Sequence, residues 1–238
     1  VVDVVGLSVK TSRTSVPYYA LRYDISPEWS VYGSYTDLYQ FQAYMRTAND
    51  TPLPPMTGNT KEIGVKYSNG STNASLSAYR ALRRDGAQFD TLNFNCSFGC
   101  YRVSSAEETS EGVDFDITGE PLPRWSVNFG YSYNNNKTRP DPENSSQDKT
   151  LSSFTPKHMF KLWNDFQLSG NEYLNKTRVG LGVIAQTRSF TAGEVCGKVN
   201  ADGTCDDNYV AYQFGQGFYS VFSARAAWKF NDRWSVAL

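Results

Sequence analysis

Few residues of this 238-residue chain have the types and the spacing that catalysis requires. Asp114 and Asp116 lie two residues apart, and such a pair of carboxylates could act as general acid and general base. His158 is the only histidine, so a triad of nucleophile, base and acid has no second candidate base. A hydrated wall facing basic neighbours would contain the same carboxylates, and Lys161 and Asp165 fit that wall equally well. We favour the wall and expect no enzyme.

The four cysteines form two local pairs in long predicted connections. Cys96 and Cys100 lie in one connection, and Cys196 and Cys205 lie in another. An even count in local pairs predicts two disulfides that staple loops in an oxidising compartment. The alternative is a four-thiolate metal site across both loops, which the spacing supports poorly. The acidic residues within 200–207 lack the closing Glu of a calcium loop and favour a polar turn. We therefore expect no metal and no cofactor.

The elements that position these residues are indicated by a sequence that occurs three times. Trp29, Trp125 and Trp234 each follow a charged residue and a short turn, and each is followed by Ser-Val. Each tryptophan opens a segment in which apolar and polar residues alternate. This pattern is typical of a tilted β-strand that enters a bilayer through an aromatic girdle.

The segment 125–133 shows the alternation best, because its aromatic and aliphatic residues fall at every second position and are separated by Ser, Asn and Gly. The chain is 15% aromatic, has 18 glycines and has a mean hydropathy of -0.52. No run approaches the roughly 18 apolar residues of a transmembrane helix, whereas a barrel wall can be polar on its inner face. The net charge of -1 makes nucleic-acid binding improbable. The sequence predicts an all-β, antiparallel transmembrane β-barrel.

About eleven strands are expected, near residues 1–10, 17–25, 29–39, 61–68, 73–84, 109–119, 124–135, 157–168, 177–189, 216–230 and from 233 onward. The connections near 26–28, 68–72, 119–124, 169–176 and 230–233 are short, and those at 40–60, 85–108, 136–156 and 190–215 are long. Apart from a short link at 11–16, short and long connections alternate. Outer-membrane barrels alternate in this way, with short turns toward the periplasm and long loops outside.

The expected strand count is odd, and the last strand stops in mid-span at Leu238. A bacterial single-chain barrel has an even count and closes on itself. We therefore interpret residues 1–238 as the later part of a larger barrel. The start has no signal peptide, which indicates that the beginning is missing or processed.

Five stretches together resemble one family, the TonB-dependent siderophore receptors, and in particular its ferric hydroxamate, coprogen and pyoverdine receptors. They are residues 17–25, 29–37, 110–116, 154–163 and 230–236. The resemblance implies a 22-stranded barrel filled by an N-terminal plug, of which about half the strands and none of the plug would be present here. It also implies uptake of a ferric siderophore energised through TonB.

The resemblance further implies location in the outer membrane of a Gram-negative bacterium, with outer-membrane lipid and lipopolysaccharide as neighbours, and we expect a monomer. The chain departs from the family in having no acidic residue within 219–225 and no proline within 38–42, which leaves the identity of the ligand open. The rival interpretation is a passive porin, which would carry a loop folded into its lumen and no plug.

Residues for binding a ferric siderophore must come from the outer loops and the upper lumen. Aromatic faces suit the organic shell of the chelate, and Arg or Tyr donors suit its oxygen rim. Three groups meet this description: Tyr39, Phe41, Tyr44 and Arg46; Tyr101 and Arg102; and Arg188 and Phe190 with Tyr209, Tyr212 and Phe214. Each of these residues could instead belong to the outer aromatic girdle or to loop packing.

Overall fold

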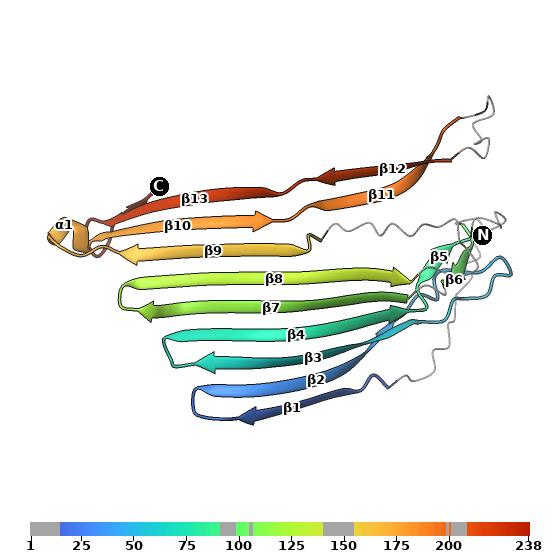
Figure 1. The fold of residues 1–238 in the computed structure, drawn as a ribbon, viewed down its shortest axis with the longest axis horizontal. Helices are drawn as coiled ribbons and strands as arrows, with labels where there is room; N and C mark the ends of the chain where they lie inside the picture. The colour runs from blue at the N-terminus through green and yellow to red at the C-terminus, as the bar shows by residue number, and fades with distance from the viewer. Residues whose placement is uncertain (1–14, 91–98, 105–106, 140–154, 199, 201–208) are drawn as a thin grey trace, which may run out of the picture.

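The computed structural model describes residues 15–90, 99–104, 107–139, 155–198, 200 and 209–238. Ten antiparallel strands form one sheet in the order β1-β2-β3-β4-β7-β8-β9-β10-β13-β14 (Figure 1). These strands are β1 (Tyr18–Asp24), β2 (Trp29–Gln40), β3 (Met56–Ser68), β4 (Thr72–Arg84), β7 (Glu107–Leu122), β8 (Trp125–Arg139), β9 (His158–Gln167), β10 (Thr177–Gln186), β13 (Tyr219–Lys229) and β14 (Ser235–Ala237). Within the described residues, β1 and β14 are open edges, so the sheet is a partial barrel wall.

Two additional hairpins lie beyond the sheet. One pairs β5 (Ala87–Phe89) with β6 (Tyr101–Val103), and the other pairs β11 (Ser189–Cys196) with β12 (Tyr209–Gln216). The single helix among the described residues is α1 (Glu172–Asn175). No described helix is long and apolar enough to cross a membrane.

The strand register separates the side chains into an apolar face and a polar face. Phe129 is paired with Leu162, and Tyr131 with Phe160. Between these positions, Gly130 is paired with Lys161 on one side and with Asp116 on the other. Directly paired residues point to the same face and successive residues to opposite faces. The predicted alternation is therefore confirmed, with the apolar face outward and the polar face toward the lumen.

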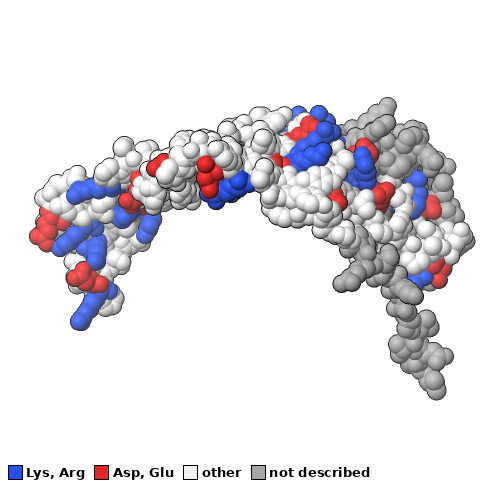
Figure 2. All heavy atoms as spheres, turned by 90° about the horizontal axis from the view of Figure 1, so that it is seen from below, with Lys and Arg blue, Asp and Glu red and all other residues white. Residues whose placement is uncertain are grey.

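The wall is one sheet thick, so its apolar side chains are exposed when no lipid surrounds the chain. Figure 2 shows charged side chains gathered at the two ends of an arched body and beneath it, whereas the middle of the upper outline carries none. An uncharged zone between two charged ends is what a bilayer-spanning wall requires.

The sidedness predicted from connection lengths is present. In Figure 1 the short turns lie together at the end marked by α1, and the described parts of the long connections, which include β5, β6, β11 and β12, lie at the opposite end. Gly119 takes a φ of 129° at one short turn, next to a register shift between Gly119 and Leu122. The connection after β9 contains α1, which the sequence pattern did not predict.

Several predicted boundaries are wrong at the long-connection end. β3 begins at Met56 instead of residue 61, and β7 and β8 reach further than predicted. The expected loop 85–108 contains the β5–β6 hairpin, and the expected loop 190–215 contains β11 and β12. Above the bilayer, backbone pairing continues without the need for an apolar face, so alternation gives no signal there. The strand predicted at 1–10 lies outside the described residues.

The β11–β12 hairpin continues the β10–β13 ladder in the same register. Gln186 is paired with Tyr219, and after a break of two residues in each strand Ser189 is paired with Gln216. The strands predicted at 177–189 and 216–230 are therefore each interrupted near the outer end.

Candidate ligand site at the outer end of the wall

Two connections pack together above β2, β3, β4 and β7. We call the described residues 41–55, 85–90 and 99–104 the outer cap. The first segment joins β2 to β3, and the other two contain the β5–β6 hairpin between β4 and β7. The backbone amide of Tyr101 donates a 2.8 Å hydrogen bond to the carbonyl oxygen of Arg46. The structure thus brings together the first two groups of predicted binding residues.

The outer cap has a small interior of its own. Among the described residues, the buried apolar side chains are Ala43, Leu53, Met56 and Cys100, and all four lie in the cap or at its border with β3. Within the described ranges, the rest of the wall is a single sheet whose apolar face packs on no second layer. Because packed side chains fix a backbone in one arrangement, the cap is a preformed structure on an otherwise coreless wall.

Aromatic side chains project from the surface of the cap. Tyr44 is 67% exposed, and Phe41 and Phe89 are each a little under half exposed. Phe89 contacts Tyr101 edge-on, with 5.6 Å between ring centroids. A Cβ at Gly99 would lie 2.4 Å from the Phe89 ring, so the absence of a side chain there lets the ring lie against the backbone. Sequence reasoning missed Phe89, although it is an aromatic residue in a long connection.

Both arginines of the cap are held by neighbours. The Arg46 guanidinium donates to the carbonyl oxygen of Asp50 at 2.7 Å and lies 2.9 Å from its carboxylate. The Arg102 guanidinium donates to the Gln88 side chain at 3.4 Å. Held arginines lose less rotamer freedom when they bind an anionic oxygen than free ones do.

Strand alternation divides the third predicted group between the two faces of its hairpin. Arg188 lies over the Phe190 ring at 5.6 Å and donates to Gln213 at 3.0 Å. Tyr212 and Phe214 are paired with Gly193 and Thr191, which alternate with Phe190. Because the hairpin resumes the register of β10 and β13 after the break, Arg188 and Phe190 continue the lumen face, whereas Tyr212 and Phe214 continue the outward face. The side chain of Tyr209 lies outside the described part.

Tyr39 also belongs to the outward face. It lies in β2, where it is paired with Thr57, and it shares the parity of Val31. It lines a shallow groove together with Leu82 and Arg84. Tyr39 therefore points to the lipid-facing side of β2, away from the rest of its predicted group.

Cys100 and Cys196 are each disulfide-bonded. Cys96 and Cys205 lie outside the described residues, so the two predicted pairings stay predictions. No group of three or more metal-binding side chains occurs in the part of the chain that the structure describes.

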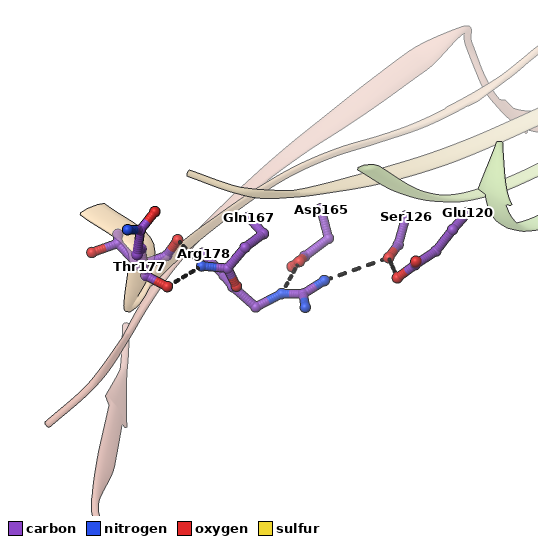
Figure 3. A network of polar contacts seen from close by, with 7 residues as sticks. Glu120, Ser126, Asp165, Gln167, Thr177 and Arg178 are labelled. Atoms are coloured by element: carbon purple, nitrogen blue, oxygen red, sulfur yellow. Dashed lines mark hydrogen bonds and ion pairs between the residues drawn. The ribbon is translucent and has the colours of Figure 1, made fainter. Parts of the chain in front are cut away.

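The lumen face carries polar networks. Arg178 of β10 forms an ion pair with Asp165 of β9 and donates to Ser126 of β8 at 3.4 Å; Ser126 in turn donates to Glu120 at 3.0 Å (Figure 3). Asp116 lines a separate groove of about 330 Å³ near the short turns. These contacts agree with the interpretation of the carboxylates as wall residues.

His158 stands at the outer start of β9 among aromatic residues. Its Nδ1 lies 2.9 Å from the Tyr131 hydroxyl, and its ring centroid lies 5.0 Å from that of Tyr133. Its backbone amide donates to the Thr187 hydroxyl at 3.0 Å. These contacts fit the structural role at the barrel rim that the sequence indicated.

Short turns at one end, a two-faced antiparallel wall and a packed cap at the other end define a membrane-spanning β-barrel protein. The family model for TonB dependent receptor-like β-barrels matches residues 3–238, and the chain belongs to this family. Membership places it in the outer membrane of a Gram-negative bacterium.

The similar proteins are siderophore receptors. The chain is 28% identical to the ferric-pyoverdine receptor PbuA of a Pseudomonas strain, over 98% of this chain and 27% of that receptor. It is 32% identical to a ferric-pyoverdine receptor of Pseudomonas putida, over 82% of this chain and 22% of the receptor. The chain thus spans about a quarter of the length of these curated relatives.

The fold agrees with that of a solved receptor. The ferripyoverdine receptor of the outer membrane of Pseudomonas aeruginosa, bound to ferripyoverdine, superposes with a TM-score of 0.74 and 25% identity. The match covers 93% of this chain and 28% of that receptor. The expected fold class and family are confirmed.

Proposed function

We propose that this chain forms part of the barrel of a receptor that imports a ferric siderophore across the outer membrane, with energy relayed through TonB. The observation that carries the proposal is the match of nearly the whole chain to ferric-pyoverdine receptors. A pyoverdine-like chelate is therefore the ligand class to test first. The remaining strands and a plug that contacts TonB would belong to the full-length protein, which we propose acts as a monomer surrounded by lipid and lipopolysaccharide.

The ligand would contact the exposed aromatic and basic groups of the outer cap and the lumen side of the third group. We propose Phe41, Tyr44, Arg46, Tyr101, Arg102, Arg188 and Phe190 for this role. The organic shell would stack on the rings, and the arginines would donate to the oxygen atoms around the iron. We exclude Tyr39, Tyr212 and Phe214 from the proposed site because their strand positions face outward, and we propose no catalytic step. Cys96 with Cys100, and Cys196 with Cys205, would close loops beside these residues.

Uptake in an iron-starved host tests the proposal. The host makes no siderophore, lacks its own ferric-siderophore receptors and carries the full-length gene. Radioactive iron is supplied as ferric pyoverdine, and parallel cultures receive ferric hydroxamate and ferric catecholate chelates. Uptake of at least one chelate that stops in an otherwise identical strain without TonB is the expected result.

The same strains separate the receptor from a passive porin. Diffusion through an open channel needs no energy input, so porin-mediated uptake would continue without TonB and would not saturate at low ligand concentration. No uptake of any supplied chelate above that of the empty host would contradict the receptor proposal.

A further inference from the structure

A buried glutamine joins the two aromatic segments of the outer cap. Gln42 is only 5% exposed and follows directly after Phe41 at the end of β2. Its side-chain amide donates to the carbonyl oxygen of Pro54 at 2.6 Å and to that of Asp85 at 2.7 Å. Its amide oxygen accepts from the backbone amide of Ala87 at 3.2 Å. One side chain thus binds three backbone groups.

These three bonds connect separate parts of the chain. Pro54 belongs to the same connection as Gln42, so its bond closes residues 41–55 into a compact loop. Asp85 and Ala87 flank the start of the β5–β6 hairpin, more than 40 positions along the chain. The Gln42 side chain therefore spans the boundary between the loop that carries Phe41 and Tyr44 and the hairpin that carries Phe89 and Tyr101.

Two further hydrogen bonds lie at this boundary. The Tyr101 amide binds the Arg46 carbonyl at 2.8 Å, and Thr57 donates to the Asp85 carboxylate at 2.6 Å. Neither contact supplies the two donor bonds and one acceptor bond that the buried Gln42 side chain makes with part-buried backbone groups. Loss of a side chain here leaves two carbonyl groups and one amide without their partner, which costs more than an exposed hydrogen bond would.

We propose that Gln42 is a positioning residue, which holds Phe41 and Tyr44 of one segment against Phe89 and Tyr101 of the other as a single surface for the ligand. Phe89 is a further contact residue of that surface. The proposal rests on the proposed function, because it assigns a role within the same ligand site. A surface that is already joined binds the ligand without the entropy cost of ordering two loops, so its affinity is higher.

Three variants of the full-length receptor test the role of Gln42. Gln42→Ala removes all three bonds. Gln42→Glu keeps an acceptor for Ala87 but places one carboxylate oxygen against two carbonyl oxygens. Gln40→Ala is the matched control, because Gln40 is the same residue type, two positions away, exposed and on the same strand end. Purified proteins are titrated with ferric pyoverdine, and hydrogen exchange is followed at the amides of Ala87 and Tyr101.

The expected result is local to the cap. Gln42→Ala raises the dissociation constant for ferric pyoverdine about tenfold, chiefly through faster dissociation, and speeds exchange at both amides. The temperature at which the barrel unfolds stays within the error of the wild type, because the membrane-spanning ladders are untouched. Gln40→Ala changes none of these quantities.

The pH dependence gives a readout that simple loss of packing would not move. A carboxyl group buried at position 42 has a raised pKa and regains a donor when protonated. The affinity of Gln42→Glu, relative to the wild type at each pH, therefore recovers in part as the pH falls from 7 toward 5, whereas that of Gln42→Ala stays low.

The outcomes separate this inference from the proposed function. A wild-type receptor that binds ferric pyoverdine while Gln42→Ala binds it equally tightly would overturn the positioning role alone. Faster amide exchange without any change in dissociation constant would overturn it as well. A wild-type receptor that binds neither ferric pyoverdine nor any other ferric chelate would overturn the proposed function, and the ligand surface with it.

Discussion

Gly119 shows most directly how one residue can be required by the backbone. Its φ of 129° lies in a region that L side chains rarely adopt, and a Cβ at this place would lie 2.1 Å from the carbonyl oxygen of Ser71. We expect Gly119→Ala to lower the free energy of unfolding by about 2 kcal/mol, from backbone strain and displacement of the β3–β4 turn. The measurement is the temperature at which the detergent-solubilised full-length receptor loses its compact form on gel electrophoresis.

Gly86→Ala is the control for this substitution. Gly86 has an ordinary backbone conformation, and a Cβ there would meet no atom within 4 Å. We expect its effect to be within about 0.5 kcal/mol of zero. Equal unfolding temperatures for both variants would show that the turn tolerates a side chain at Gly119.

Removing either partner of the Arg178–Asp165 ion pair should cost a different amount of stability. The Asp165 side chain is 10% exposed, whereas that of Arg178 is 42% exposed. Arg178→Ala leaves a buried carboxylate without its cation, whereas Asp165→Ala leaves an arginine that can turn toward lumen water. Breaking a buried pair typically costs about 3–5 kcal/mol, and the watery lumen reduces this cost.

We therefore expect Arg178→Ala to destabilise the barrel by about 2 kcal/mol and Asp165→Ala by about half as much. Urea unfolding in detergent, followed by circular dichroism of the β signal, measures the difference. Arg178→Ala combined with Asp165→Asn should recover much of the loss, because the buried charge is then gone. A larger loss for Asp165→Ala than for Arg178→Ala would contradict the account.

At the scale of elements, α1 shows how contacts within a short turn help to stabilise it. The Asn171 side chain accepts from the Leu174 amide at 3.0 Å and caps the helix, and Lys176 lies 2.7 Å from the Glu172 carboxylate. The hydrogen bond and the charge of Lys176 hold the pKa of Glu172 below its ordinary value of 4.5. The stabilisation from this pair is present above the ordinary pKa and is lost as the pH falls through the lowered one.

Lys176→Met should return the pKa of Glu172 to near 4.5, because the lowering comes from Lys176. Carbon-13 NMR of the glutamate carboxyl groups in the labelled receptor follows the titration, and Glu172→Gln assigns the signal. High salt should produce part of the same rise in the unsubstituted protein, because both groups are in contact with solvent. An unchanged midpoint in Lys176→Met would mean that the two side chains do not meet in solution.

The same scale explains which elements could be predicted from sequence. Within the bilayer, lipid requires an apolar residue at every second position, so the segment at 125–133 predicted β8 closely. Above the bilayer this requirement ends. The first part of β3 contains Thr57, Gly58 and Asn59. It pairs with β2 and β4 through its backbone, and its apolar and polar residues do not alternate. Such extensions and the two outer hairpins were therefore missed.

The sequence predicted the residue types of the candidate site better than their arrangement in space. Aromatic and basic residues in long connections indicated Phe41, Tyr44 and Tyr101. The contact between the Arg46 and Tyr101 backbones depends on packing between distant segments, and no local pattern reports it. Tyr39 is different, because it was predicted to bind the ligand although it falls on the same face of β2 as Val31, which points outward.

At the scale of the whole molecule, the two faces of the wall make separate predictions for its tryptophans. Trp125 shares the apolar face and stacks on Phe166 with 6.0 Å between ring centroids. Trp163 is paired with Asn128 and lies on the lumen face, where its ring covers Gly180 and Gly182. The interfacial girdle should therefore contain Trp125 and exclude Trp163.

Quenching by lipid distinguishes these positions in the full-length receptor reconstituted in bilayers of brominated phospholipid. Trp125→Phe should remove fluorescence that the brominated lipid quenches, whereas Trp163→Phe should remove fluorescence that it leaves unchanged. A water-soluble quencher admitted to the lumen should show the opposite preference. Because the register links every strand to its neighbours, quenching of Trp163 by lipid would reverse the assignment of faces across the whole sheet, and the lumen role of Arg178 and Asp165 would be lost with it.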